Sequence, residues 1–404
     1  MLSYTDARRK VIEVATSIPR PSLRTHVEIE QAFGRILAEP VLADRDYPPF
    51  DRSTRDGFAV RAEDAQAPGA RLECVGELRA GGRFDEGVLP GQCVEIMTGA
   101  SVPRGADSIV MVEHIQRDGR TILLERAAKK GEHIVFRGTE ARAGALLVAP
   151  KTRMGYAEMA LAAQAGTTRL SVFAAPRLAV LSTGDEVVDA RSTPGPLQVR
   201  NSNGISIEIM ARTAGAETLQ LGNVPDEKGA LRAAIERGLA EDILVLSGGV
   251  SMGKYDLVEQ VLADLGAEFH YTGVSIRPGR PAVFATCRNK LVFGLPGNPV
   301  STMVTFELFV LPAVDVWNGG DARPLPVFRA KLETTVREKG PMTHFLPARI
   351  EWEGREARVT QLPWQGSGDV VALARANGFL IVGPERLEIA PGEWVDVIPR
   401  RGAI

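Results

Sequence analysis

The order of apolar and polar positions changes along the chain and predicts different elements in different regions. Residues 3–16 have apolar positions spaced for one helix face, with Ser3 or Thr5 as the expected cap and Pro19 beyond the end. From 47 to about 137, short apolar runs such as GFAV and DSIVMV alternate with glycine and proline turns, which predicts a compact all-β module.

Helical periodicity returns after the β module. A helix is expected at 153–165, with Thr152 as its N-cap and Gly166 at its end. Between 172 and 318 the chain alternates strand, loop and helix, which predicts βαβ units and a parallel sheet covered on both faces. Short strands return after the linker at 319–326 and predict a small C-terminal barrel or sandwich.

Composition places the chain among ordinary globular proteins. It has 404 residues, 44% of them hydrophobic and 24% charged, which is enough for about two to four domains. A formal net charge of −2 gives no bulk attraction to nucleic acid or to an anionic membrane, and neither is an expected partner. Three widely spaced cysteines, no apolar leader and no run of about 18 apolar residues favour a reducing compartment, and we expect the cytoplasm.

Three similar loops contain most of the candidate functional residues. In 177–186, 242–256 and 290–301, an apolar strand runs into a glycine-turned loop with hydroxyl or acidic side chains. Loops at the carboxyl ends of parallel strands bind phosphorylated ligands, because backbone N–H groups and helix N-termini converge there. The three loops therefore predict a shared binding crevice.

The first loop, STGDE, combines hydrogen-bond donors with acids. Thr183 and Gly184 offer a hydroxyl and N–H groups to a phosphate or a pterin-like ring. Asp185 and Glu186 are placed to hold a metal or a ring nitrogen, although Asp185 could instead cap a helix.

The second loop, SGGVSMGKYD, is richer in glycine and serine. Gly248 and Gly249 permit close backbone approach, and Ser247 and Ser251 supply hydroxyl groups. Asp256 could be a magnesium ligand or orient an attacking group. The alternative is a tight turn followed by a helix that Asp256 caps.

Two other segments have both a structural and a functional interpretation. Asp226 follows Pro225 at another strand end, where helix capping is the simplest role. The RPGRP segment places Arg277 and Arg280 around a rigid turn, and these guanidinium groups with Ser301 could bind a phosphate or a tetrahedral oxyanion. A solvated basic turn is the alternative.

Several common functional classes lack their sequence signatures. The five histidines have no metal-ligand spacing, and the motifs GxSxG, HExxH, GxxxxGK[ST] and a GxGxxG after a strand do not occur. Serine hydrolase, zinc protease, P-loop NTPase and dinucleotide-binding functions therefore lose support. In the β module, Asp56 before Gly57 is most simply a turn residue.

Several motifs occur in order along nearly the whole chain: PPFDRSTRDGFAV, MTGASVPRGAD, STGDE, SNG, SGGVSMGKYD, RPGRP and GLPGNPVS. Together they resemble the molybdopterin molybdenumtransferase family, MoeA, which is similar to the C-terminal half of gephyrin. The resemblance implies an α/β fold combined with all-β modules, in a homodimer with its active cleft between subunits. The implied domains are an elongated linking domain (1–46 and 138–171), an inserted β module (47–137), a central parallel α/β domain like MogA (172–318) and a small C-terminal β-barrel (319–404).

The resemblance also implies a reaction, the final step of molybdenum cofactor synthesis. Adenylylated molybdopterin would be bound, its pyrophosphate bond cleaved with magnesium, molybdate placed on the dithiolene and AMP released. Motif positions imply catalytic roles for Asp56, Thr98, Glu186, Asp226 and Asp256, with Glu186 and Asp256 as magnesium ligands. They imply substrate binding by Thr183, Gly184, Asp185, Ser247, Gly248, Gly249, Ser251, Pro296, Gly297 and Asn298, and a molybdate pocket of Arg277, Arg280, Ser301 and Ser367.

The chain departs from the family pattern at a few positions. Arg277 and Arg280 stand where lysines are usual, Glu140 replaces an aspartate, and Pro347 stands where an arginine is expected, with Arg349 two residues further on. Arginine offers a planar fork in place of a compact ammonium, so oxyanion preference can differ. Two alternatives therefore stay open: a non-catalytic pterin-binding scaffold or delivery protein, and a tungstate-preferring paralogue.

Overall fold

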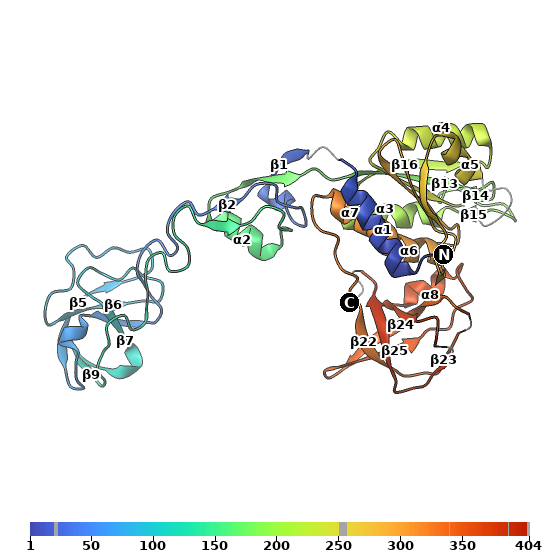
Figure 1. Ribbon diagram of the computed structural model, residues 1–404. Coiled ribbons are helices and arrows are strands. Elements are labelled where there is room, and N and C mark those ends of the chain that lie inside the picture. The colour runs from blue at the N-terminus through green and yellow to red at the C-terminus, as the bar shows by residue number, and fades with distance from the viewer. Residues whose placement is uncertain (20–22, 250–256, 339, 387, 402–404) are drawn as a thin grey trace. The chain divides into compact units, whose positions relative to one another are not determined.

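The computed structural model describes residues 1–19, 23–249, 257–338, 340–386 and 388–401, which fold as two compact units (Figure 1). The chain passes between the units within strands β1 (Arg24–Glu28) and β12 (Arg169–Phe173), and also after residues 33 and 38. Unit 1 comprises Met1–Thr25, Gly34–Ala38 and Ser171–Ile404, and unit 2 comprises His26–Phe33 and Glu39–Leu170.

The centre of unit 1 is a mixed sheet with the strand order β16-β13-β17-β21-β20-β18. The first four of these strands are parallel, as predicted, whereas β20 and β18 are antiparallel to their neighbours. The chain reverses between β20 and β21 at Arg288 and Asn289, whose positive φ angles of 51° and 60° make a tight hairpin in place of a helical crossover. The strands are β13 (Arg177–Thr183), β16 (Glu217–Val224), β17 (Ile243–Ser247), β18 (Glu268–Thr272), β20 (Val283–Cys287) and β21 (Lys290–Leu295).

Helices cover both faces of this sheet, because successive strand residues point to opposite sides. Ala179 and Leu181 of β13 pack with α4 and α5, while Leu178 and Val180 belong to the cluster formed with the other helices. Figure 1 shows α4 and α5 on one side of the sheet and α1, α3 and α7 on the other. The helices are α1 (Tyr4–Ser17), α3 (Ser202–Ala214), α4 (Lys228–Gly238), α5 (Leu257–Asp264), α6 (Pro299–Thr305) and α7 (Leu311–Trp317), with a π-helical turn η4 (Phe306–Val310) between α6 and α7.

The first helix confirms the predicted one, including its cap. The Ser3 hydroxyl accepts the N–H of Asp6 at 3.1 Å. Ala7, Val11 and other apolar residues of α1 are buried in the same cluster as β13 and α7. The N-terminal helix is therefore part of the core of unit 1.

The helical run from Pro299 to Trp317 is 19 residues long, with a mean hydropathy of 1.5, enough by length and composition to cross a membrane. Polar residues such as Thr302 and Asp315 interrupt its apolar positions, so the sequence contains no uninterrupted apolar run of this length. Of this run, 83% is buried inside the protein. It is a core helix of unit 1.

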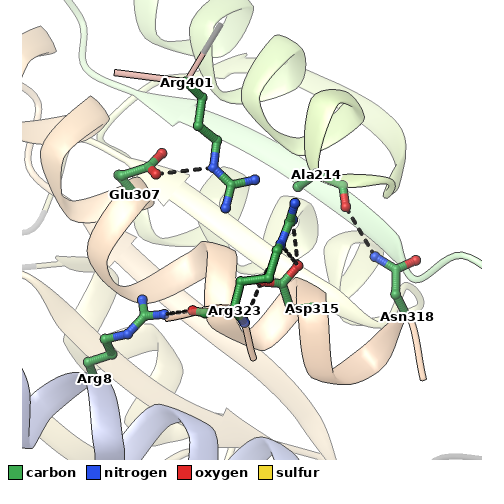
Figure 2. Close-up of polar contacts among 7 residues, drawn as sticks. All are labelled: Arg8, Ala214, Glu307, Asp315, Asn318, Arg323 and Arg401. Carbon is green, nitrogen blue, oxygen red and sulfur yellow. Dashed lines mark hydrogen bonds and ion pairs between the residues drawn. The ribbon is translucent and has the colours of Figure 1, made fainter. Parts of the chain in front are cut away.

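Partly buried ion pairs hold the end of this helix and the segment that follows it (Figure 2). The Asp315 carboxylate is buried and accepts from the Arg323 guanidinium at 2.6 and 2.9 Å. Arg8 of α1 donates to the carbonyl of Arg323, and Arg401 pairs with Glu307 at 3.2 Å. Because breaking a buried pair leaves an uncompensated charge, these contacts hold the two segments in place.

The C-terminal part of unit 1 contains a closed barrel with the strand order β24-β25-β22-β28-β26 and a pairing of β26 back to β24. This agrees with the predicted C-terminal barrel. The short strand β19 (Ile276–Arg277) pairs in parallel with the start of β24, with Arg277 opposite His344. The other elements are β22 (Phe328–Leu332), β23 (Val336–Arg337), β24 (Thr343–Glu353), β25 (Glu356–Gln361), α8 (Val370–Arg375), β26 (Gly378–Val382), β27 (Glu388–Ile389) and β28 (Trp394–Pro399).

Unit 2 is built mainly of strands, with a sheet ordered β7-β4-β6-β5-β9-β8. Cys74 and Cys93 are opposite each other on β5 and β6, and both are buried free thiols. The one α-helix among its described residues, α2 (Tyr156–Gln164), begins after Gly155, so the predicted start at 153 and cap at Thr152 are wrong. The strands are β2 (Val41–Leu42), β3 (Arg52–Ser53), β4 (Gly57–Val60), β5 (Arg71–Leu78), β6 (Gln92–Ile96), β7 (Ser108–Met111), β8 (Ile115–Asp118), β9 (Thr121–Leu124), β10 (Ile134–Val135) and β11 (Leu146–Val148).

Candidate functional site

A cavity of about 650 Å³ lies in unit 1 where β13, β17 and β21 end and α3 and α6 begin. Parallel strands place their carboxyl ends at the same sheet edge, which brings loops distant in sequence together. The cavity is lined by Ser182, Thr183, Gly184, Glu186, Val187, Val199, Arg200, Asn201, Ser202, Asn203, Asp226, Ser247, Gly248, Gly249, Pro281, Pro296, Gly297, Asn298, Pro299 and Gly368.

Most of the substrate-binding residues predicted from sequence line this cavity, as do two of the predicted catalytic acids. Asp185 does not line it, and Ser251 and Asp256 lie outside the described residues. The residues brought together are Thr183, Gly184, Glu186, Asp226, Ser247, Gly248, Gly249, Pro296, Gly297 and Asn298. Glu186 and Asp226 thus lie at one edge of the sheet, in agreement with the predicted shared binding crevice.

The loop after β17 depends on its glycines. Gly248 and Gly249 have φ angles of +95° and +64°, which side-chain-bearing residues rarely adopt. A Cβ on Gly248 would also lie 2.6 Å from the carbonyl oxygen of Thr183. The chain can therefore turn tightly against β13 and leave space above the strand ends.

Two asparagines that sequence reasoning missed organise the strand ends. Asn201 caps α3 through the N–H of Gly204 and exchanges hydrogen bonds with Ser182 at the end of β13. Asn203 donates to the Ser247 hydroxyl at 2.8 Å and to the Gly297 carbonyl at 2.7 Å. The SNG motif (202–204) contains Asn203, but nothing in the motif signals these partners, because they come from other loops.

The cavity walls contain buried polar atoms without partners. Oδ1 of Asn203 and Oγ1 of Thr183 are buried and lack a hydrogen bond among the described residues. Because the Gly297 carbonyl can only accept, the Asn203 amide nitrogen must face it, which fixes the position of Oδ1. An unsatisfied buried polar group costs about 1–3 kcal/mol, and such groups are uncommon away from functional sites.

The acidic side of the cavity has a perturbed carboxyl group. Partial removal from water, followed by the negative charges of Asp185 and Glu186, raises the pKa of Asp226. Asp185 accepts the backbone N–H of Asp226 at 3.1 Å. Helix α4 begins at Lys228 after Glu227, so the alternative of Asp226 as its N-cap is wrong. The carboxylates of Asp185 and Glu186 therefore lie close enough to disfavour the charged form of Asp226.

This arrangement suits a divalent cation, although the described part does not form a complete ligand set. Carboxylate oxygens are the side-chain ligands that magnesium prefers, and a cation would relieve the repulsion that raises the pKa of Asp226. Among the described residues, no group of three or more histidine, cysteine, aspartate or glutamate side chains is positioned to hold a metal. The second predicted magnesium ligand, Asp256, belongs to the segment that is not described.

The four predicted molybdate residues lie near the cavity in sequence but do not line it. Arg277 lies in β19, Arg280 is exposed after it, and Ser301 is buried in α6. Ser367 accepts from the Asn298 amide at 2.7 Å, and its carbonyl accepts the N–H of Val300. Pro281, Pro299 and Gly368, which neighbour these residues, do line the cavity.

The remaining predicted residues belong to unit 2 and to the barrel. The Asp56 carboxylate accepts the N–H of Thr98 at 2.6 Å and its hydroxyl at 2.8 Å, and these donors lower the pKa of Asp56. Glu140 pairs with Arg52 at 2.7 Å on the surface of unit 2. Pro347 lies in β24 opposite Phe379.

Family comparisons match the same three regions of the chain. Residues 2–166 match the MoeA N-terminal region (domain I and II), 179–316 a probable molybdopterin binding domain, and 329–400 the MoeA C-terminal region (domain IV). Molybdopterin molybdenumtransferase from Bacillus subtilis is 34% identical over 92% of this chain and 89% of its own length. The chain belongs to the molybdopterin molybdenumtransferase family. The relative of the same name from Nostoc sp. is 38% identical over 92% of this chain and 88% of its own length.

Solved structures of the family have the same fold. A molybdopterin biosynthesis MoeA protein from Pyrococcus horikoshii aligns with a TM-score of 0.79 and 32% identity, covering 98% of this chain and 99% of that chain. A second structure with that description gives a TM-score of 0.83 at 25% identity, covering 99% of this chain. The resemblance in the sequence motifs and the predicted fold class, an α/β domain with all-β modules and a C-terminal barrel, are confirmed.

Proposed function

We propose that this protein is a molybdopterin molybdenumtransferase that catalyses the last step of molybdenum cofactor synthesis. It binds adenylylated molybdopterin, promotes cleavage of the pyrophosphate bond, releases AMP and transfers molybdenum from molybdate to the dithiolene. The observation that carries this proposal is the cavity at three strand ends, where residues from the STGDE, SGGV and GLPGNP loops meet in a chain of this family.

Different residues of the cavity would bind the substrate, move a proton and hold the metal. Backbone N–H groups and hydroxyls around Thr183, Ser247 and Gly248 bind and orient the pterin and its phosphates. Asp226, with its raised pKa, is suited to hold or move a proton near the pyrophosphate. Glu186, together with Asp256, would hold magnesium, which when bound neutralises charge on the phosphate oxygens.

Molybdate would be bound by the separate basic segment. A tetrahedral dianion needs several positive or hydroxyl donors, and Arg277, Arg280, Ser301 and Ser367 supply them. Asp56 and Thr98 of unit 2 would complete the site in a homodimer, and the enzyme would act in the cytoplasm. Light scattering of the purified protein tests the dimer, because a monomeric mass would contradict it.

A turnover experiment tests the proposal. Purified protein given adenylylated molybdopterin, magnesium and molybdate should release AMP and form active cofactor. Asp256→Ala should still bind the substrate but not turn it over. Binding without AMP release by the unmodified protein would instead favour the scaffold or delivery alternative, for which the transferase names of the relatives give no support.

Replacing molybdate by tungstate in the same assay tests the third alternative. A molybdenumtransferase should require less molybdate than tungstate for half-maximal cofactor formation. The reverse order would identify a tungstate-preferring enzyme and would point to the arginines at 277 and 280 as its cause.

A further inference from the structure

The charges that line the cavity pose a problem for a phosphorylated ligand. Glu186 and Asp226 are both acidic, and a pyrophosphate group is itself strongly negative. Among the described lining residues, Arg200 is the one with a cationic side chain. A positive group at this place would offset the repulsion between the ligand and the two acids.

A short strand and one hydrogen bond hold the Arg200 backbone and one edge of its guanidinium group. Arg200 ends the short strand β15 (Val199–Arg200), which pairs in parallel with β14 (Val187–Val188) directly after Glu186. Its Nε donates to the carbonyl of Ser192 at 3.0 Å. The other two guanidinium nitrogens, Nη1 and Nη2, have no hydrogen bond or ion pair with the described residues, and the side chain is exposed.

The chain continues from Arg200 into the N-terminus of α3, which also lines the cavity. Ser202 and Asn203 are the first two residues of the helix, and their N–H groups precede the one that the Asn201 cap occupies. The positive end of this 13-residue helix therefore begins two residues after Arg200 and lines the same cavity. The buried Asn203 side chain with its unpartnered Oδ1 is independent support for a ligand at this end.

We propose that Arg200 is a substrate-binding residue that grips a phosphate of the molybdopterin ligand through Nη1 and Nη2, beside the N-terminus of α3. This inference rests on the proposed function and adds the residue that recognises the anionic part of its substrate. Two parallel N–H donors match two phosphate oxygens, as in other arginine–phosphate pairs. The residue acts in binding, because it lies on the wall of the cavity and takes no proton from the reaction.

The decisive variants are Arg200→Ala and Arg200→Lys, with Arg191→Ala as the matched control. Arg191 is an exposed arginine nine positions earlier in the same segment and does not line the cavity. For Arg200→Ala we expect KM for adenylylated molybdopterin to rise about 10- to 100-fold, with kcat changed less than about threefold. Arg200→Lys should recover part of the loss, because the charge stays but the fork is lost. Arg191→Ala should match the unmodified protein.

Direct binding of inorganic pyrophosphate, measured by calorimetry on the full chain, gives a second readout that needs no turnover. Its affinity should fall in Arg200→Ala and stay unchanged in Arg191→Ala, and the difference should shrink as salt is added. An unmodified protein that does not turn over would contradict the proposed function but leave this binding test intact. Equal KM and equal pyrophosphate affinity in Arg200→Ala and the unmodified protein would overturn the inference, and so would a loss confined to kcat.

Discussion

Two aspartates with predicted catalytic roles, one in each unit, have opposite electrostatic surroundings. Asp226 in unit 1 is partly removed from water and lies near the negative charges of Asp185 and Glu186, and both effects raise its pKa. Asp56 in unit 2 accepts two hydrogen bonds from Thr98, and its pKa is lowered. An aspartate side chain therefore binds a proton or a cation more readily at Asp226, whereas the anionic form is favoured at Asp56.

This contrast separates two kinds of function. A carboxyl group whose charge is disfavoured takes up a proton more readily, or binds a metal that offsets the neighbouring negative charges. A carboxylate with two fixed donors keeps its charge and its orientation, so it suits an electrostatic or positioning role. The predictions below test whether the two aspartates differ in this way.

The largest expected effect is on turnover. Asp226→Ala should lower kcat for AMP release by about 100-fold or more, because a group that moves a proton contributes about 10²- to 10⁴-fold. Affinity for the substrate should change little. A variant with kcat within about threefold of the unmodified protein would remove Asp226 from catalysis. The surface variant Glu217→Ala, at the opposite end of β16 from the cavity, is the control.

Magnesium should stabilise the folded protein through the cavity carboxylates of unit 1 and not through Asp56 of unit 2. At a concentration about ten times its dissociation constant, a ligand that binds the folded state adds about 1.4 kcal/mol to the free energy of unfolding. This gain should appear as a higher melting temperature in the unmodified protein and in Asp56→Asn. It should be lost in Glu186→Gln if the cavity carboxylates bind the metal. A full gain in Glu186→Gln would contradict that site.

The pH dependence of stability should have opposite signs for the two aspartates. The raised pKa of Asp226 means that the folded state binds the proton more tightly, so its contribution to stability increases as pH falls through that pKa. Asp226→Asn should therefore be slightly more stable than the unmodified protein at neutral pH, by less than about 1 kcal/mol because the group is partly solvated. Denaturant midpoints between acid and neutral pH check this.

Asp56 should behave in the reverse way. Its lowered pKa contributes stability above the ordinary aspartate value, and this contribution is lost as pH falls through the lowered pKa. Asp56→Asn should be less stable than the unmodified protein at neutral pH, and the difference should vanish in acid. If the stability of Asp56→Asn and of Asp226→Asn, each relative to the unmodified protein, changed with pH in the same direction, the two aspartates would not have opposite electrostatic surroundings.

The smallest effect is expected from Thr98→Val. This variant removes the hydroxyl donor at 2.8 Å but keeps the backbone N–H, which is the larger cause of the lowered pKa. The pKa of Asp56 should rise only part of the way toward its ordinary value, as measured by NMR titration of the labelled carboxyl group. Thr98→Ser is the control, because it keeps the hydroxyl. A pKa that returns fully to the ordinary value would give the hydroxyl the main role.

Much of the fold followed from local patterns. Ser3 as a cap, the strand at 177–183 and the short strands after 326 were predictable because periodicity and capping depend on neighbouring residues. The antiparallel β20 was missed because Arg288 and Asn289 form a tight turn without glycine. The start of α2 was missed because Gly155, rather than Thr152, precedes the first helical residue.

Some residues of the candidate site were likewise predictable from the sequence, and others were not. Glycine turns and acids after apolar strands identify Thr183, Glu186 and Gly248 from the sequence alone, and all three line the cavity. Arg200 and Asn203 were missed because their partners or neighbours in the cavity come from other loops. The pKa of Asp226 is raised first by its partial removal from water and then by charges about 40 positions away in the chain, and neither can be read from its neighbours in sequence.

The sequence by itself determined the family, the order of the elements and most of the side chains that surround the cavity, because each motif is a local arrangement of a strand, a turn and a helix start. The tertiary structure decided which of those side chains meet, which hydrogen-bond donor each one contacts and which carboxyl group has a raised pKa. These outcomes depend on strand order and on the distance between groups in space. Hydrogen bonds and charge interactions act across that distance, whatever the separation along the chain.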